Sequence, residues 1–161
     1  MAFITNSTFV KGLNGWRPVN RAAAVRATVV ADASAYANQR LLRVTTSQDG
    51  GSVAIDLNDQ RVGSGWVQTQ PASTVTVSTV DPSVTALAMV RATPGTGHVT
   101  GALALWQLNP NHSTTTPFTV GEAWTLVLGA HDLESGGDTF RVEFYLDHAG
   151  SSVDIGLVSL F

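Results

Sequence analysis

Apolar and polar residues alternate with a period of two along most of this chain. In the clearest run, residues 140–147, Phe, Val, Phe and Leu alternate with Arg, Glu, Tyr and Asp. Residues 53–57, 74–78 and 153–157 show the same alternation. Successive side chains of a β-strand point to opposite faces, so this period predicts strands that bury one face and leave the other wetter.

Three segments need a separate interpretation. Residues 101–108 and 124–128 are apolar on both faces, which predicts central strands. Residues 21–37 are rich in Ala and are the candidate for a helix. Their period-two alternation and the β-branched residues at 28–30 favour a strand instead, which ends at Ala31 and is followed by a loop.

Turn-forming residues separate the runs from one another. Gly, Pro, Asn and Asp recur between them, where they supply a positive φ or a preset φ. Their spacing predicts about 9–11 short strands. The pattern therefore predicts an all-β chain, a two-sheet antiparallel jelly-roll β-sandwich that fills residues 1–161 as a single domain.

The composition agrees with a folded β domain and excludes several other classes. Hydrophobic residues make up 43% of the chain, with 20 Val and 19 Thr, which is too apolar for a disordered protein. Charged residues make up only 13%, and the net charge of −3 argues against a nucleic-acid partner bound through a basic surface. The absence of cysteine excludes disulfides and thiolate zinc sites.

Membrane insertion and export also lack support in the sequence. Residues 92–121 carry no Asp, Glu, Lys or Arg, but Pro, Gly and Asn interrupt them too often for a membrane span. The first residues have neither the basic region nor the long apolar stretch of a signal peptide. We therefore expect no membrane insertion and, for the chain as written, no export signal.

Four segments in order resemble a known group of proteins. Residues 4–9 read Ile-Thr-Asn-Ser-Thr-Phe and are followed by Gly-Leu-Asn-Gly-Trp; the others are 35–44, 118–126 and 152–160. Together they resemble the carbohydrate-binding-module jelly rolls of the galactose-binding-like superfamily, of the xylan- and glucan-binding type. The resemblance implies a jelly-roll fold, polysaccharide binding without catalysis, and packing roles in the core for Trp16 and Trp124.

The departures from that family concern a metal site. Many members hold a structural calcium with acidic residues, but this chain has Val10 in one of those positions and Gly156 and Leu157 in two others. Calcium needs six to eight oxygen ligands, and Asp154 is the one nearby carboxylate that remains. We expect no cofactor and no metal, with a structural calcium at Asp154 as the weaker alternative.

Aromatic residues are the best candidates for a ligand site. A sugar presents an apolar C–H face that packs on a flat ring, and hydroxyls that need planar polar partners. If the chain has a carbohydrate-binding site, the sequence favours Trp66, Trp106, Tyr145, Gln107 and Arg91. For Trp66 a packing role is equally plausible, and for Trp106 the strand context favours the core.

Catalysis has little support in the sequence. The four histidines are scattered without metal-ligand spacing, and no Gly-x-Ser-x-Gly segment occurs. The carboxylate pairs Asp132/Glu134 and Asp56/Asp59 are more typical of solvated turns than of a glycosidase pair. We therefore expect that the protein is not an enzyme and keep a small β-sandwich enzyme as the least favoured hypothesis.

The favoured hypothesis is a non-catalytic module on the surface of a phage virion, as a minor tail or head-decoration protein. Its role would be structural and adhesive, with glycan binding as an addition. Three observations favour it: we find no export signal, no Pro/Gly/Ser-rich linker of the kind that joins a module to an enzyme, and eight Arg against one Lys. The alternative is a carbohydrate-binding module of a secreted bacterial glycoside hydrolase.

The partners follow from the same hypothesis. We expect other virion proteins or copies of this chain, together with cell-surface polysaccharide. Residues 1–80 carry a charge of +3 and residues 81–161 a charge of −6, which would favour head-to-tail contacts between copies.

Overall fold

The computed structural model describes residues 8–9, 12–13, 15–36, 39–62, 65–70, 73–78, 83–108, 111–132 and 139–160, and the side chains of these except 57–78 and 139. The strands within these ranges are β1 (Trp16–Pro18), β2 (Val25–Ala31), β3 (Arg40–Thr46), β4 (Gly51–Val62), β5 (Gly65–Gln70), β6 (Ser73–Ser78), β7 (Ser83–Ala92), β8 (Val99–Leu108), β9 (His112–Val120), β10 (Thr125–Asp132), β11 (Thr139–Leu146) and β12 (Ser152–Leu160). A single turn of 3-10 helix, η1 (Ala22–Ala24), precedes β2.

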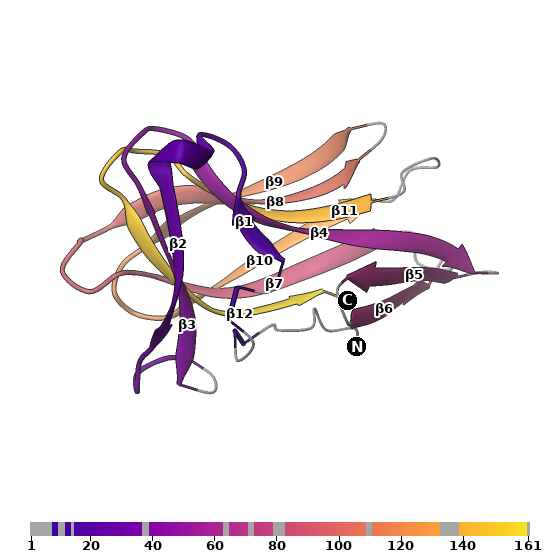
Figure 1. Cartoon of the computed structure of the whole chain (residues 1–161), viewed down its shortest axis with the longest axis horizontal. Coiled ribbons are helices and arrows are strands. Elements are labelled where there is room, and N and C mark those ends of the chain that lie inside the picture. The colour runs from indigo at the N-terminus through magenta and orange to yellow at the C-terminus, as the bar shows by residue number, and fades with distance from the viewer. Residues whose placement is uncertain are drawn as a thin grey trace.

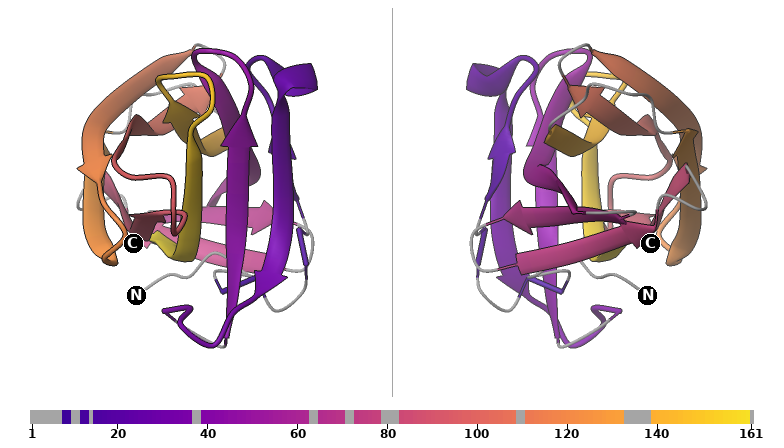
Figure 2. Two further views of the ribbon diagram at one scale, coloured as in Figure 1. Left: turned by 90° about the vertical axis from the view of Figure 1, so that its left-hand side faces the viewer. Right: turned by 90° about the vertical axis from the view of Figure 1, so that its right-hand side faces the viewer.

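The strands form two antiparallel sheets (Figure 1). The seven-stranded sheet has the order β6-β5-β4-β11-β8-β9, and β1 pairs with β4 beside this path. The five-stranded sheet has the order β10-β7-β12-β3-β2. The chain crosses between the sheets several times, for example from β7 to β8 and from β11 to β12, and the strands enclose a common interior (Figure 2). The predicted all-β sandwich is confirmed.

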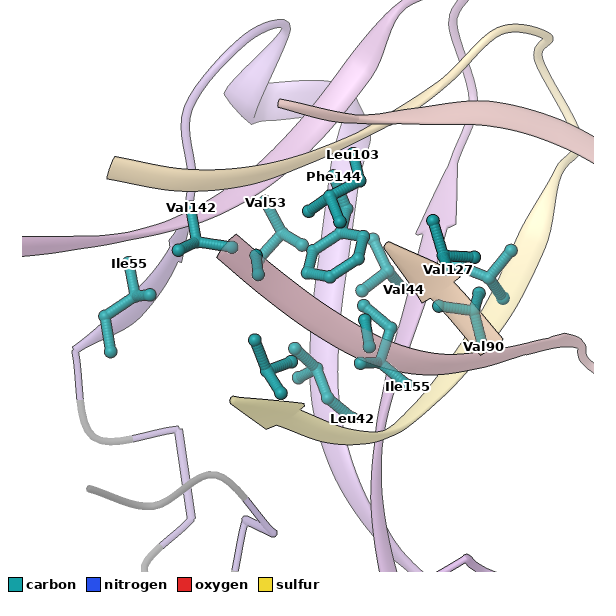
Figure 3. Packing of buried hydrophobic residues seen from close by; sticks show 14 of the residues in the cluster. Leu42, Val44, Val53, Ile55, Val90, Leu103, Val127, Val142, Phe144 and Ile155 are labelled. Carbon is teal, nitrogen blue, oxygen red and sulfur yellow. The ribbon is translucent and has the colours of Figure 1, made fainter. Parts of the chain in front are cut away.

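The core lies between the sheets and is built from the inward positions of each strand. Alternation places every second residue inward, so each strand supplies a row of apolar side chains. Figure 3 shows these rows meeting, with Leu42, Val44, Val90, Val127 and Ile155 from the five-stranded sheet and Val53, Ile55, Leu103, Val142 and Phe144 from the seven-stranded sheet. All ten are buried.

Trp16 belongs to this core, as predicted. It is 3% exposed, and its ring centroid lies 5.8 Å from that of Phe9 and 6.0 Å from that of Phe144. The short strand β1 positions it, because the backbone of Trp16 pairs with that of Ile55 on β4.

Two of the three ambiguous segments behave as predicted and one does not. Residues 25–31 form β2, and residues 101–108 lie in β8, between β11 and β9. Residues 124–128, predicted as a central strand, belong instead to the outermost part of the five-stranded sheet, because β10 is its edge strand. Leu126 and Leu128 are 50% and 48% exposed. An apolar run does not reveal whether its outer face is covered.

The described residues contain twelve strands, more than the expected 9–11. Strand β9 accounts for part of the difference. It includes four consecutive Ser and Thr residues at 113–116, which give no apolar alternation to read. These residues are extended because their backbone pairs with β8 at the edge of the sheet, where their side chains need no partner in the core. No helix in the described residues is long and apolar enough to cross a membrane.

We predict that Gly101→Ala destabilises the protein. A Cβ at Gly101 would meet the backbone oxygen of Tyr145 and would lie 2.7 Å from Cζ of Phe118, so backbone and core would have to shift. The free energy of unfolding, measured by chemical denaturation, should fall by about 1–3 kcal/mol. Gly121→Ala is the matched control, since its Cβ would lie 3.5 Å from the nearest atom, in His98. Equal effects of the two substitutions would contradict the assignment.

Candidate functional site

Polar and aromatic side chains gather on the outer face of the seven-stranded sheet. On β11, the residues that alternate with the core positions Val142 and Phe144 are Arg141, Glu143 and Tyr145. Pairing of β11 with β4 and β8 sets three rows, which we call the Tyr145 face: Ser52–Tyr145–Ala102, Ala54–Glu143–Ala104 and Asp56–Arg141–Trp106.

The middle row places a carboxylate below the surface. Ala54 and Ala104 are fully buried on either side of Glu143, which is 1% exposed. The hydroxyl of Ser52 donates a hydrogen bond of 2.5 Å to Oε1 of Glu143, and it accepts one of 2.9 Å from the backbone N–H of Asn20. Buried carboxylates are costly without such partners, so the bond from Ser52 holds Glu143 in one position.

Tyr145 and Trp106 are the half-buried aromatic residues of the face. Burial raises the pKa of the Tyr145 phenol to about 12, and the negative charge of Glu143 and a hydrogen bond to it add to the increase. A hydrogen bond from the indole N–H of Trp106 acts in the opposite direction on this pKa, which places that N–H near the phenol oxygen. This N–H is nevertheless buried without a partner of good hydrogen-bond geometry among the described residues.

An ion-pair cluster occupies the third row. Asp56 accepts hydrogen bonds of 2.6 Å and 3.1 Å from Nε and Nη2 of Arg141, and one of 2.5 Å from Nη2 of Arg17 on β1. The bond to Asp56 is the main reason that the pKa of Arg141 is raised. The shared bonds hold these three side chains together, and the backbone of Arg141 is in register with that of Trp106.

This combination suits a ligand that has both apolar and hydroxyl-bearing surfaces. Trp and Tyr offer a large apolar ring with one polar atom. Arg141 and Asp56 offer planar donors and acceptors beside it. A sugar ring has complementary groups, namely C–H bonds on its faces and hydroxyls on its rim.

The structure brings together two of the five predicted site residues, Trp106 and Tyr145. Gln107 follows Trp106 on β8 and therefore lies on the inward row, where it is 1% exposed. Arg91 lies on β7 of the other sheet. The backbone of Trp66 pairs with Arg61 and Val77, and its side chain is outside the described residues.

The carbohydrate-binding residues predicted from the sequence did not include the charged residues of this face, Arg17, Asp56, Arg141 and Glu143. Arg141 and Glu143 could have been found, because they alternate with core residues in the same strand as Tyr145. Asp56 and Arg17 could not have been placed, because only the pairing of β4 with β1 and β11 brings them to Arg141.

Arg91 belongs to a separate charged cluster on the outer side of the five-stranded sheet. Its centre is Asp154, which is fully buried and pairs in register with Arg91 and Arg43. Asp154 accepts bonds of 2.7 Å and 3.0 Å from Arg43, of 3.2 Å and 3.1 Å from Arg91, and of 2.9 Å from Thr93. Arg91 also reaches Asp32, at 3.2 Å.

Trp124 covers this cluster and is not part of the core between the sheets, contrary to the expected packing role. It is half-buried, its ring lies 4.5 Å from the guanidinium carbon of Arg91, and its N–H donates to the backbone oxygen of Ser34 at 2.8 Å. Gly156 makes room for it, because a Cβ there would lie 2.9 Å from the Trp124 ring and from Cβ of Tyr36. Glycine at position 156 therefore leaves room for the Trp124 ring.

The cluster also bears on the calcium alternative at Asp154. Two guanidinium groups and a hydroxyl occupy the oxygens of this carboxylate, so a cation would have to displace them. No group of three or more His, Asp or Glu among the described residues is arranged to hold a metal ion. The two arginines supply at Asp154 the positive charge that a cation would supply.

Comparison with known proteins identifies the fold. No family profile matches this chain, and neither does any curated protein. Among solved structures, TmCBM61 in complex with β-1,4-galactotriose is 13% identical, with a TM-score of 0.64 over 100% of this chain and 98% of that one. The CBM22-1 xylan-binding domain from Paenibacillus barcinonensis Xyn10C is 13% identical, with a TM-score of 0.64 over 91% and 84%.

A phage protein is similar as well. The enzymatically active domain of tailspike protein 4 from bacteriophage CBA120 is 10% identical, with a TM-score of 0.64 over 99% of this chain and 21% of that one. Likeness at these identities concerns the fold. The chain has the jelly-roll fold of the carbohydrate-binding modules, and the resemblance drawn from its sequence is confirmed at that level.

We predict that Asp154→Asn is strongly destabilising. The substitution leaves Arg91, which is 5% exposed, without its buried counter-charge. The free energy of unfolding, from urea denaturation, should fall by about 3–5 kcal/mol. Asp132→Asn, at an exposed position at the end of β10, should change it by less than about 0.5 kcal/mol. A loss at Asp154 no larger than at Asp132 would show that the cluster is not a stabilising element.

We predict that the Tyr145 phenol ionises near pH 12. Its pKa in the folded protein is raised from the ordinary value of 10.0 to about 12, so folding favours the protonated form. The resulting stabilisation is fully present below pH 10 and is lost as the pH rises from 10 to 12. Phenolate absorbance during alkaline titration measures this, and Tyr145→Phe should remove the late transition. Removal of a transition near pH 10 would contradict the assignment.

Proposed function

We propose that this chain is a non-catalytic glycan-binding module and that the Tyr145 face is its binding surface. The observation that carries the proposal is that two half-buried aromatic residues, Trp106 and Tyr145, share one face of the sheet with the ion pairs of Asp56 to Arg17 and Arg141. The hydroxyls of a bound sugar would find planar partners in Arg141 and Asp56 beside these rings. The apolar ring of Trp106 would pack against the C–H face of the same sugar.

The two carboxylates of the face support binding rather than glycoside hydrolysis. A glycosidase needs two carboxyl groups that face each other across the scissile bond. Asp56 is instead engaged by Arg17 and Arg141, and Glu143 is buried and held by Ser52. Asp56 and Glu143 lie in adjacent rows on one face of the sheet, where they orient neighbouring groups.

The polysaccharide class is inferred from two similar structures. One of them is a complex with β-1,4-galactotriose, and the other is described as a xylan-binding domain. We take β-1,4-linked polysaccharides of cell surfaces as the first ligands to test. The face carries Arg17 and Arg141 against Asp56 and Glu143, so its formal charges cancel, which suits an uncharged chain.

We further propose that the module acts on the surface of a phage virion, as a minor tail or head-decoration protein in contact with other virion proteins or copies of itself. Eight Arg against one Lys and the likeness to a tailspike domain support this setting. The alternative, a module of a secreted bacterial glycoside hydrolase, is supported by the likeness to a domain of Xyn10C. Electron microscopy of phage particles labelled with an antiserum against this chain separates the two.

Substitution of the aromatic pair tests the glycan site. Trp106→Ala should weaken binding to the best ligand among β-1,4-xylan, β-1,4-glucan, β-1,4-galactan and peptidoglycan by about 10-fold or more, because about 1.5–3 kcal/mol of aromatic burial is lost. Tyr145→Phe keeps the ring but loses the hydroxyl bond, so a smaller loss is expected. Calorimetry and affinity electrophoresis measure both.

Tyr36→Ala is the matched control for this series. Tyr36 is 53% exposed and belongs to the Trp124 cluster on the other sheet, so its removal should leave the affinity unchanged. Circular dichroism verifies that each variant is folded. The proposal is wrong if the native protein binds none of the four polysaccharides, or if folded Trp106→Ala binds as tightly as the native protein.

A further inference from the structure

The side chains of Trp106 and Tyr145 lean toward each other along the strands. Tyr145 lies four residues from Arg141 on β11, and Arg141 is in register with Trp106 on β8. Four residues of a strand span about 13 Å. The indole N–H of Trp106 nevertheless lies near the phenol oxygen of Tyr145. Both side chains therefore reach over the row that lies between them and meet at their polar ends.

The row between the two aromatic residues is sealed from solvent. It consists of Ala54, Glu143 and Ala104, which are 0%, 1% and 0% exposed. These residues alternate with core positions and so lie on the outer face of the sheet, where only neighbouring side chains can cover them. Trp106 and Tyr145 reach across this row and supply part of the cover.

Glu143 accepts hydrogen bonds from two neighbours on this face. One comes from Tyr145, two residues further along β11, and it favours the protonated phenol, so the phenol O–H is the donor. The hydroxyl of Ser52 donates the other, at 2.5 Å. Arg141, two residues earlier on β11, bonds to Asp56 through Nε and Nη2. The carboxylate of Glu143 is thus an acceptor that Ser52 and Tyr145 share.

Ser52 is itself fixed by the backbone of the segment that follows β1. It is fully buried, and its Oγ accepts a hydrogen bond of 2.9 Å from Asn20 N–H. Its own N–H donates to the oxygen of Asn20 at 3.0 Å, and its oxygen accepts from Val19 N–H at 3.0 Å. A chain of hydrogen bonds therefore connects the backbone of residues 19–20 to the carboxylate of Glu143.

We propose that Glu143 is a positioning residue of the glycan site, which fixes the hydroxyl of Tyr145 and thereby holds the two aromatic side chains in the arrangement that a sugar contacts. The inference rests on the proposed function and adds the group that sets the geometry of the binding surface. Glu143 is 1% exposed, so it acts through Tyr145 and does not touch the ligand. A binding surface that is already ordered loses less conformational entropy when the ligand binds.

A double-mutant cycle of glycan affinity tests this role. Glu143→Gln keeps the size of the side chain but leaves one acceptor oxygen, for which Ser52 and Tyr145 compete. It should weaken binding of the best polysaccharide among the four tested above by about 3- to 10-fold, the usual effect of one lost hydrogen bond. Tyr145→Phe breaks the same bond, so Glu143→Gln should cause no further loss in that background. Losses that multiply in the double variant overturn the proposal.

Ser52→Ala provides a second cycle that leaves the carboxylate in place. It removes the donor that holds Glu143 from the other side, so Tyr145 is fixed less well. Binding should again weaken, and again only while the Tyr145 hydroxyl is present. This cycle decides the question if Glu143→Gln does not fold, which circular dichroism establishes.

The indole N–H resonances separate positioning from a general change in structure. Trp106→Phe assigns the resonance of Trp106 in the proton–nitrogen correlation spectrum. Glu143→Gln should shift or broaden this resonance and leave that of Trp124 in place, since the N–H of Trp124 bonds to the oxygen of Ser34 on the other sheet. An unchanged Trp106 resonance, or equal changes in both, overturns the proposal.

Glu122→Gln is the matched control, since it makes the same substitution at another carboxylate that accepts a hydrogen bond. Glu122 accepts from Gly95 N–H at 2.7 Å, and it is exposed in the turn between β9 and β10. It should leave the affinity and the Trp106 resonance unchanged. If folded Glu143→Gln binds as tightly as the native protein, this proposal is overturned and the proposed function stands. If the native protein binds none of the four polysaccharides, both are overturned.

Discussion

The apolar layer between the two sheets is the constraint on which the rest of this structure depends. Burial of Val142 and Phe144 against the opposite sheet fixes which residues of β11 face inward. The alternate residues Arg141, Glu143 and Tyr145 therefore face outward. A slip of one residue in pairing would exchange the two faces of the strand and would put charges into the core. Packing therefore specifies the candidate binding surface as strictly as it specifies the interior.

The two sheets use their outer faces in different ways. On the five-stranded sheet, Trp124 and the residues around Ser34 cover a buried carboxylate, Asp154, that two arginines neutralise. On the seven-stranded sheet, a buried carboxylate lies beside two half-buried aromatic rings instead. The cluster around the buried carboxylate Asp154 thus attaches the residues around Ser34 and the Trp124 ring to one face. On the other face, the buried carboxylate Glu143 orients side chains at the surface.

The candidate site is continuous along one strand. β8 carries Trp106 in the row of Arg141 and Ala102 in the row of Tyr145. Ala102 is half-buried between these positions, whereas Ala104 is buried. In the proposed function, a glycan lies across these rows on the outer face of the sheet.

The sequence by itself determined the strand content, the sandwich and the outward position of Tyr145, because period-two alternation reports the face of each residue within its own strand. The core position of Trp16 was implied by the resemblance to carbohydrate-binding modules. Only the tertiary structure decided which strands are neighbours. Register brought Arg17 and Asp56 to Arg141, assigned Arg91 to the other sheet, and put the apolar strand β10 at an edge. Trp124 lies outside the interior because the glycine at 156 lets its ring approach the sheet. Alternation within one strand carries no information about which distant strand pairs with it. Strand pairing and contacts between segments depend on both segments together.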